Sequence, residues 1–421
     1  MTQILDWLLI FFGTIFSFYS FKRICFQKNC SVSNFIICIV YVFCILPIML
    51  NYFIGIPEYN TVYWYKVFIS SMENEAISCI YDLYIFFSIT SLFIYASKFK
   101  PKDTRNDKFM FFNSKLFSKI IVLSPLIYIL ISGTLKNYMV YNTQSLRGFD
   151  INNSSYFTNL MALIFLSLFS YYSSFFKKEK KKKSDYIIFI LYNFLIIWIV
   201  GKRFIFANIA ITILYYLSQL DLKENIRKKI FKLVPIFLMI LICFSGLYLK
   251  VVRPLSDTSF DSIYEMLRVD FGRDDVIKYT IEKELIQNER ILEYRGETML
   301  GLLCQIVPRK IWPEKPYPHY MYLTASLLNV SIFKLPAGTT PSYYEMAISN
   351  FGYFGIIFAI FTLVLLCYFA DKSRSIDTKY IWTMLIVVLL TQSMDIYIIY
   401  IFIYALCKIL EFMYNLKKIK I

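Results

Sequence analysis

Residues 294–319, YRGETMLGLLCQIVPRKIWPEKPYPH, lie at the centre of a long polar interruption in a chain that otherwise consists of apolar runs. The interruption extends over 251–350, is rich in Arg, Tyr and Pro, and contains His319, the only histidine of the protein. Apolar runs of membrane-spanning length precede and follow it. We therefore expect transmembrane helices in 1–250, a large loop in 251–350, and further transmembrane helices in 351–421.

The composition places the chain in a lipid environment. Of 421 residues, 58% are hydrophobic and 19% are aromatic, and the mean hydropathy is +0.54. A soluble domain could not bury so much apolar surface. We expect an all-α, polytopic integral membrane protein with about eleven transmembrane helices, at residues 4–21, 34–54, 78–97, 119–135, 156–176, 186–201, 204–220, 233–249, 351–370, 380–394 and 396–413.

The distribution of charge predicts the topology. The formal net charge is +16, and Lys and Arg are concentrated after the first, third, fifth, seventh and ninth spans and at the C-terminus. Loops rich in Lys and Arg are cytoplasmic by the positive-inside rule. The C-terminus is then cytoplasmic, whereas the N-terminus and the loop 251–350 lie outside the bacterial plasma (inner) membrane. Topology explains the positive charge, so no nucleic-acid partner is expected.

Cations also occur on the predicted outer side, where this rule disfavours them. Lys202 and Arg203 occupy the tight turn GKRF between two spans, and Arg147 lies in the outer loop SLRGFD. A guanidinium can bind phosphate oxygens through two parallel hydrogen bonds, so these residues are candidate anion ligands. The alternatives are side chains that extend from the interface into water and, for Arg147, an ordinary loop salt bridge.

The loop begins with a segment of helical periodicity. Residues 262–286 have the apolar spacing of an amphipathic helix, and we expect Arg268 and Arg273 to carry charge on its exposed side. The residues Leu300, Leu303, Ile306 and Val307 have the spacing of a short helix at the membrane surface.

A proline-rich segment follows. The short helix is expected to end at Pro308, and Pro313, Pro316 and Pro318 then impose an extended and stiff path. Cations and aromatic rings alternate along this path, namely Arg309, Lys310 and Lys315 with Trp312, Tyr317 and Tyr320. Such a combination suits a sugar phosphate, because rings stack on sugar faces while cations bind phosphate.

Two glutamates and the histidine are the candidate general bases. Glu314 and Glu345 are preferred, because a carboxylate beside cations remains ionised over the physiological range. A lone loop histidine such as His319 is more often a surface residue. No H-E-x-x-H, paired-cysteine or Gly-rich phosphate motif occurs, so we expect no metal and no cofactor. The acidic pair Glu73 and Glu75 is the alternative that would hold a metal.

With these residues identified, the chain resembles the Wzy-type O-antigen polymerases, which join oligosaccharide repeat units. Many helices, one large outer loop late in the chain and helices after it match the layout of that family. The local resemblance is carried by RGETMLGLLCQIVPRKIWPEKP at 295–316, AGTTPSYYE at 337–345 and ISNFGYFG at 348–355. In addition, GKR at 201–203 resembles the Gly-x-Arg of the family's preceding hairpin.

The resemblance implies a GT-C-like, lipid-linked glycosyltransferase that polymerises repeat units carried on undecaprenyl pyrophosphate. It implies that a chain-length regulator and a flippase act with it. Cations would stabilise the pyrophosphate leaving group, and one base would accept the proton of the acceptor hydroxyl. An O-antigen ligase, which has the same kind of site, is the nearest alternative. A polysaccharide flippase or other transporter is disfavoured, because the central spans carry almost no charge.

The predicted topology can be tested with a single cysteine. In a background without reactive cysteines, Asn288→Cys should react with a membrane-impermeant thiol reagent in intact or outer-permeabilised cells, because residue 288 lies in the outer loop. Reaction only after the inner membrane is broken would place the loop in the cytoplasm.

Overall fold

The computed structural model describes residues 2–100, 115–135, 154–178, 180–201, 204–219, 259–335 and 338–419. All secondary-structure elements in these ranges are helices, which agrees with the predicted all-α class. The α-helices are α1 (Thr2–Phe26), α2 (Val32–Val40), α3 (Leu46–Phe53), α4 (Phe68–Glu73), α5 (Glu75–Lys98), α7 (Lys115–Ile131), α9 (Ser154–Lys177), α10 (Lys183–Val200), α11 (Phe204–Gln219), α13 (Phe260–Phe271), α14 (Asp274–Ile281), α15 (Glu297–Leu303), α16 (His319–Leu328), α17 (Tyr343–Phe351), α18 (Tyr353–Lys372), α19 (Ile376–Thr391) and α20 (Asp395–Ile419).

Membrane spans are evident in the described part of the chain. Six helical segments there are long and apolar enough to cross a bilayer: Thr2–Phe26, Val32–Phe53, Glu75–Lys98, Tyr156–Lys177, Lys183–Val200 and Tyr353–Lys372. Ser118–Ile131 and Phe204–Gln219 are shorter apolar helices. A multi-pass helical membrane protein is therefore confirmed, whereas the number eleven remains a prediction. The expected span 233–249 and the boundary at 250 lie outside the described residues.

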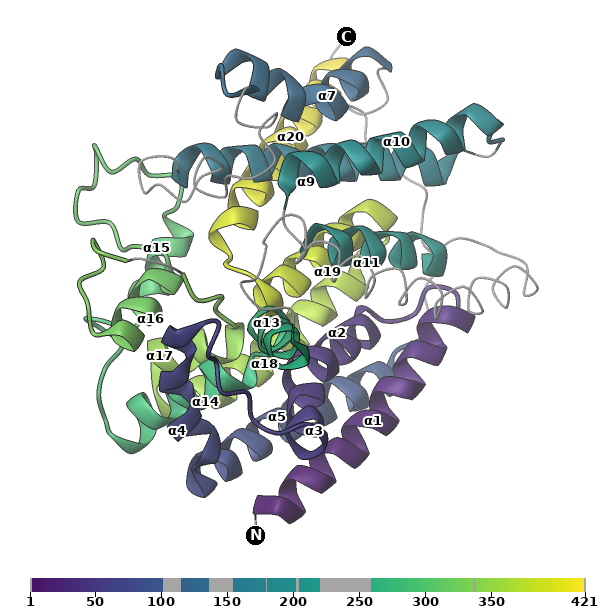
Figure 1. Cartoon of the computed structure of the whole chain (residues 1–421). Coiled ribbons are helices and arrows are strands. Elements are labelled where there is room, and N and C mark those ends of the chain that lie inside the picture. The colour runs from purple at the N-terminus through teal and green to yellow at the C-terminus, as the bar shows by residue number, and fades with distance from the viewer. Residues whose placement is uncertain are drawn as a thin grey trace.

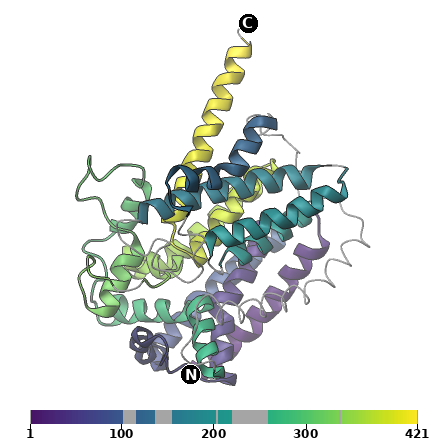
Figure 2. The same cartoon turned by 45° about the horizontal axis from the view of Figure 1, so that its top comes forward.

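One group of helices packs around α9 and α20, and another packs around α2, α5 and α18. In Figure 1, α10 crosses the upper part of the view beside α9, and α20 rises past them to the C-terminus. Helix α9 packs against α7, α10 and α20, and α1 packs against α2 and α5. The short helices α15, α16 and α17 gather on the left of the same view. Figure 2 shows that the distal part of α20 extends beyond the rest of the protein.

A kink in the second span provides a docking point for the loop. The π-helical turn Tyr41–Ile45 separates α2 from α3. Because Pro47 has no N–H, the carbonyl of Phe43 lacks its usual helical donor four residues later. The backbone N–H of Arg273 donates to this carbonyl at 3.0 Å. The start of α14 is thereby fixed to the kinked span.

Helix α14 is buried although three of its eight residues are charged. All eight are buried, and the helix packs against α4, α5 and α17. Arg268 of α13 donates to both carboxylate oxygens of Asp274, at 3.1 and 2.9 Å. Lys278 donates to the hydroxyl of Ser78 at 2.9 Å. Burial of Asp274 and Lys278 is tolerable because each charge has a polar partner, whereas Asp275 Oδ2 has none in the described part of the chain.

The exposure that the sequence predicted for Arg268 and Arg273 is wrong. Arg268 and Arg273 are each only 2% exposed. The predicted helix 262–286 is interrupted at Gly272, where a Cβ would lie 2.6 Å from the carbonyl oxygen of Arg268. Arg273 donates to the carbonyl of Thr391, the last residue of α19, at 3.0 Å. Amphipathic spacing shows which face is polar, but that face meets other helices here instead of water.

A glycine turn connects the loop to the next span. Gly352 joins α17 to α18 with φ of +60°, a conformation that favours glycine. A Cβ at Gly355 would lie 2.2 Å from the carbonyl oxygen of Ala347, so only glycine permits the close approach of the two helices. The segment FGYFG at 351–355 therefore holds α17 at the beginning of the span α18.

The buried ion pair should be essential for stability. Arg268→Ala leaves Asp274 charged and unpaired in the interior, which should reduce the free energy of unfolding by about 3–5 kcal/mol. Lys283→Ala breaks an exposed pair with Glu289, and its effect should be about 0–1 kcal/mol. Thermal unfolding of both variants in detergent measures the difference. Equal shifts in the midpoint would show that the pair does not stabilise α14.

Candidate functional site

The predicted phosphate ligands before the loop cannot be placed. Arg147, Lys202 and Arg203 lie outside the described residues, so their role remains a prediction. Arg268 and Arg273 are engaged in the packing of α13 and α14, as described above. The remaining candidates all lie between Arg309 and Glu345.

Two cations of the proline segment bind the main chain. Arg309 donates to the carbonyls of Lys315 at 2.6 Å and Pro316 at 3.2 Å, and its guanidinium lies 3.7 Å from the ring centre of Tyr317. Lys315 donates to the carbonyls of Gln305 and Val307, at 3.3 and 2.9 Å. Burial, followed by the positive charge of Arg309, lowers the pKa of Lys315. These cations fold the segment back on itself.

Two other predicted site residues remain at the surface of this segment. Lys310 and Glu314 are exposed. Lys310 is thus available to an anion, whereas Glu314 lacks the enclosure that would position it as a base. The structure therefore separates Glu314 from the other two candidate bases.

His319 and Glu345 are brought together in the interior. His319 is the first residue of α16 and is 4% exposed, and Glu345 in the first turn of α17 is fully buried. His319 Nε2 lies 2.7 Å from Glu345 Oε2. The backbone N–H of Ser342 donates to Glu345 Oε1 at 3.1 Å. This bond caps α17, since a glutamate at the third position commonly reaches back to the N-cap amide.

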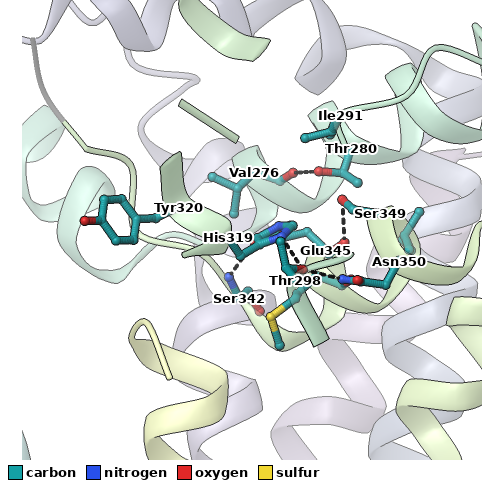
Figure 3. Close-up of polar contacts among 12 residues, drawn as sticks. Val276, Thr280, Ile291, Thr298, His319, Tyr320, Ser342, Glu345, Ser349 and Asn350 are labelled. Carbon is teal, nitrogen blue, oxygen red and sulfur yellow. Dashed lines mark hydrogen bonds and ion pairs between the residues drawn. The ribbon is translucent and has the colours of Figure 1, made fainter. Parts of the chain in front are cut away.

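A hydrogen-bond chain extends from the pair through Thr298 to Asn350 (Figure 3). Asn350 Oδ1 accepts from the N–H of Met299 at 3.3 Å, which fixes the amide orientation and makes Nδ2 the donor to Thr298 at 2.7 Å. Because the Glu345 carboxylate accepts from His319 Nε2, Nδ1 of the neutral ring carries no proton, and we assign the Thr298 hydroxyl as the donor to Nδ1 at 3.1 Å. In this assignment His319 carries its proton on Nε2 and donates it to Glu345.

A small pocket opens beside the pair. Its polar lining comes from helix ends distant in sequence, namely Thr298, His319, Ser342, Gln392, Ser393 and Asp395. Leu302, Pro341, Met346, Leu389 and Met394 complete the wall. The backbone N–H of Glu345 donates to the Ser342 side chain and completes the capping box of α17. The pocket therefore offers acid–base groups beside the beginning of α17.

Asp395 adds a second carboxyl group to this pocket. It is the first residue of α20, in the short connection between the predicted spans 380–394 and 396–413. Burial raises its pKa, while the hydrogen bond from Ser393 and the positive charge of Lys315 oppose this rise. A carboxyl group that retains its proton more readily than usual can act as a proton donor.

Sequence reasoning missed Thr298 and Asn350. Both are common polar residues in helices, and neither has a spacing that distinguishes it from a solvated side chain. It also missed Arg295, which donates to Glu284 at 2.6 Å and to the carbonyl of Ser349 at 2.8 Å. Asp395 had a usable signal, because a charged residue between two apolar runs is often functional.

The tautomer of His319 can be measured directly by NMR, because the protein has one histidine. In protein labelled with ¹⁵N-histidine and reconstituted in lipid, neutral His319 should give the NMR shifts of an Nε2–H tautomer. Glu345→Gln should weaken this preference, because the carboxylate acceptor is lost. An Nδ1–H tautomer in the unsubstituted protein would contradict the chain from Asn350 to Glu345.

No family model, curated protein or solved structure matches this chain. The resemblance of residues 295–316, 337–345 and 348–355 to the O-antigen polymerases consequently remains an inference from the sequence. Function has to be derived from the chemistry of the pocket and from its place beside the membrane spans.

Proposed function

We propose that this protein polymerises lipid-linked oligosaccharide repeat units into a surface polysaccharide at the outer leaflet. The donor is a glycan on undecaprenyl pyrophosphate, and the acceptor is a hydroxyl of another repeat unit. The observation that carries the proposal is the buried His319–Glu345 pair, in which His319 lines a small pocket and Glu345 lies on α17 directly before the span α18. Such a location suits a substrate with its lipid in the membrane and its sugars outside.

The reaction needs one proton acceptor and stabilisation of one leaving group. The acceptor oxygen forms a bond to the anomeric carbon, and the bond from that carbon to the pyrophosphate oxygen breaks. The pyrophosphate leaves with the bonding electrons, and the hydroxyl proton passes to the base. Fixed cations would stabilise the negative charge of the leaving group. In this proposal Arg147, Lys202, Arg203 and the exposed Lys310 supply those cations.

We assign the base to His319 and a positioning role to Glu345. This ranking differs from the sequence-based preference for glutamate. The two carboxylate oxygens of Glu345 are occupied by His319 and by the N–H of Ser342. His319 Nδ1, in contrast, contacts only the hydroxyl of Thr298 among the hydrogen bonds found here. A sugar hydroxyl can replace that of Thr298, while Glu345 stabilises the imidazolium that forms.

A lipid-linked glycan ligase is the second candidate, and the histidine in the pocket favours it as much as it favours a polymerase. The two reactions share the donor and the proton transfer. They differ in the acceptor, which is another repeat unit in one case and a lipid core in the other. The carrier of the product therefore distinguishes them, and the pocket alone does not.

The base assignment predicts an ordered set of losses. In cells that depend on this protein for polymer, His319→Gln should reduce the rate of chain extension by about 10²–10⁴-fold, because a general base contributes that much. Glu345→Gln should also be impaired, whereas Glu314→Gln should retain normal polymer. Glycan ladders on gels measure chain length, and immunoblots of membranes verify equal protein levels. Glycolipid with single repeat units should accumulate in the impaired strains.

The same strains separate the alternatives. Normal ladders from His319→Gln, at normal protein levels, would contradict the assigned base. Loss of all glycan from the lipid core, with long polymer retained on undecaprenyl pyrophosphate, would identify a ligase. If Glu314→Gln is the most damaging change, the site lies at the exposed surface of the proline segment instead of in the pocket.

A further inference from the structure

Large apolar side chains are exposed on α15 and along the segment that follows it. The exposed fractions are 41% for Leu300, 72% for Leu303, 59% for Ile306 and 76% for Ile311. They lie outside the six candidate spans. We name this set the α15 face. Single exposed apolar residues are ordinary, but a cluster of them marks a surface that contacts lipid or protein.

The hydrogen bonds of α15 fix this face close to the beginning of a membrane span. The N–H of Gly296 donates to the carbonyl of Asn350 at 3.1 Å, and the N–H of Met299 donates to the Asn350 side chain at 3.3 Å. Arg295 donates to the carbonyl of Ser349 at 2.8 Å. The span α18 begins at Tyr353, only a few residues later. Since a helix rises about 1.5 Å per residue, Leu300 and Leu303 lie within roughly 10 Å of these contacts.

The face is rigid because the proline segment is folded back onto α15. Arg309 and Lys315 bind main-chain carbonyls on either side, as described above. Gly301 packs so closely on Pro316 that a Cβ at Gly301 would lie 2.9 Å from the Pro316 Cβ. The exposure of the apolar residues is therefore a property of a fixed surface and does not come from a free chain.

The lipid-facing surface of α18 starts beside this face. Tyr353 and Phe354, at the beginning of the helix, are 65% and 61% exposed, and Ile357 and Phe361 one and two turns later are 65% and 63% exposed. A span of this hydropathy presents such residues to acyl chains. Gly352, which precedes Tyr353, lies against Arg295 at the start of α15. The beginnings of α15 and α18 therefore lie close together.

We propose that the α15 face inserts into the bilayer leaflet in which α18 begins, and that it anchors the proline segment at the level of the lipid headgroups. The exposed Lys310 then lies among anionic headgroup oxygens, and Trp312 lies in the interfacial zone that tryptophan prefers. The occupant of the face is lipid, because the contacts with Asn350 and Ser349 place it at the end of a span. The anchor does not depend on any catalytic role of His319.

Quenching of Trp312 by brominated lipid tests the anchor. The protein is reconstituted in phosphatidylcholine vesicles with bromine at a shallow position on the acyl chains, and its fluorescence is compared with that of Trp312→Phe. We expect a fluorescence component that depends on Trp312 and is quenched by bromine. In a variant with Leu303→Asn, Ile306→Asn and Ile311→Asn, quenching of this component should fall by about half or more. Ile286→Asn removes an exposed apolar residue outside the face and should change nothing.

Three outcomes would overturn the proposal. Unquenched Trp312 emission in the unsubstituted protein would show that the face does not contact lipid. Quenching that is unchanged in the triple variant would show that the apolar residues do not hold Trp312 in the membrane. Quenching that appears only at a low protein-to-lipid ratio would indicate that a second copy of the protein covers the face at higher ratios. The single variant Leu303→Asn, expected to weaken quenching partially, provides the same test if the triple variant does not fold.

Discussion

The burial of the charged helix α14 is the constraint on which the rest of the structure depends. Buried charges such as Asp274 and Lys278 are tolerated within a membrane protein only if they and the main-chain ends of their helix have partners. Arg268 supplies two hydrogen bonds to Asp274, and the N–H of Arg273 uses the carbonyl of Phe43 that Pro47 leaves free. The loop is therefore bound to the kinked second span and does not lie loosely on the membrane surface.

The site follows from this docking. Helix α14 packs against α17, and α17 carries Glu345. The turn at Gly352 then ties α17 to the span α18, while Arg295 and Asn350 tie α15 to the same turn. His319, Thr298 and Glu345 meet because three short helices begin or pass at this point. A pocket built from helix ends is well suited to acid–base chemistry, since the helix N-termini favour nearby carboxylates.

The proline segment has a different role from the one that its composition indicates. Arg309 and Lys315 would be natural phosphate ligands in an extended chain, yet their donors are directed to carbonyls of the same segment. In a folded loop, main-chain carbonyls lie close to the side chains. They compete with any external anion for the N–H groups of Arg309 and Lys315. Lys310 is exposed, so it can still bind a phosphate, which the sequence predicted for Arg309, Lys310 and Lys315 alike.

The sequence alone determined the helical class, the membrane location and most span positions, because bilayer thickness imposes a length and a hydropathy on each span that can be read without tertiary contacts. It also selected Glu345 and His319, together with Glu314, as candidate bases. Only the tertiary structure decided that these two pair at 2.7 Å, that Thr298 and Asn350 complete the chain, and that Arg268 and Arg273 are buried. The reason is that residues such as Thr298 and Asn350 have no local periodicity or spacing, and their function depends on contacts between helices far apart in the chain.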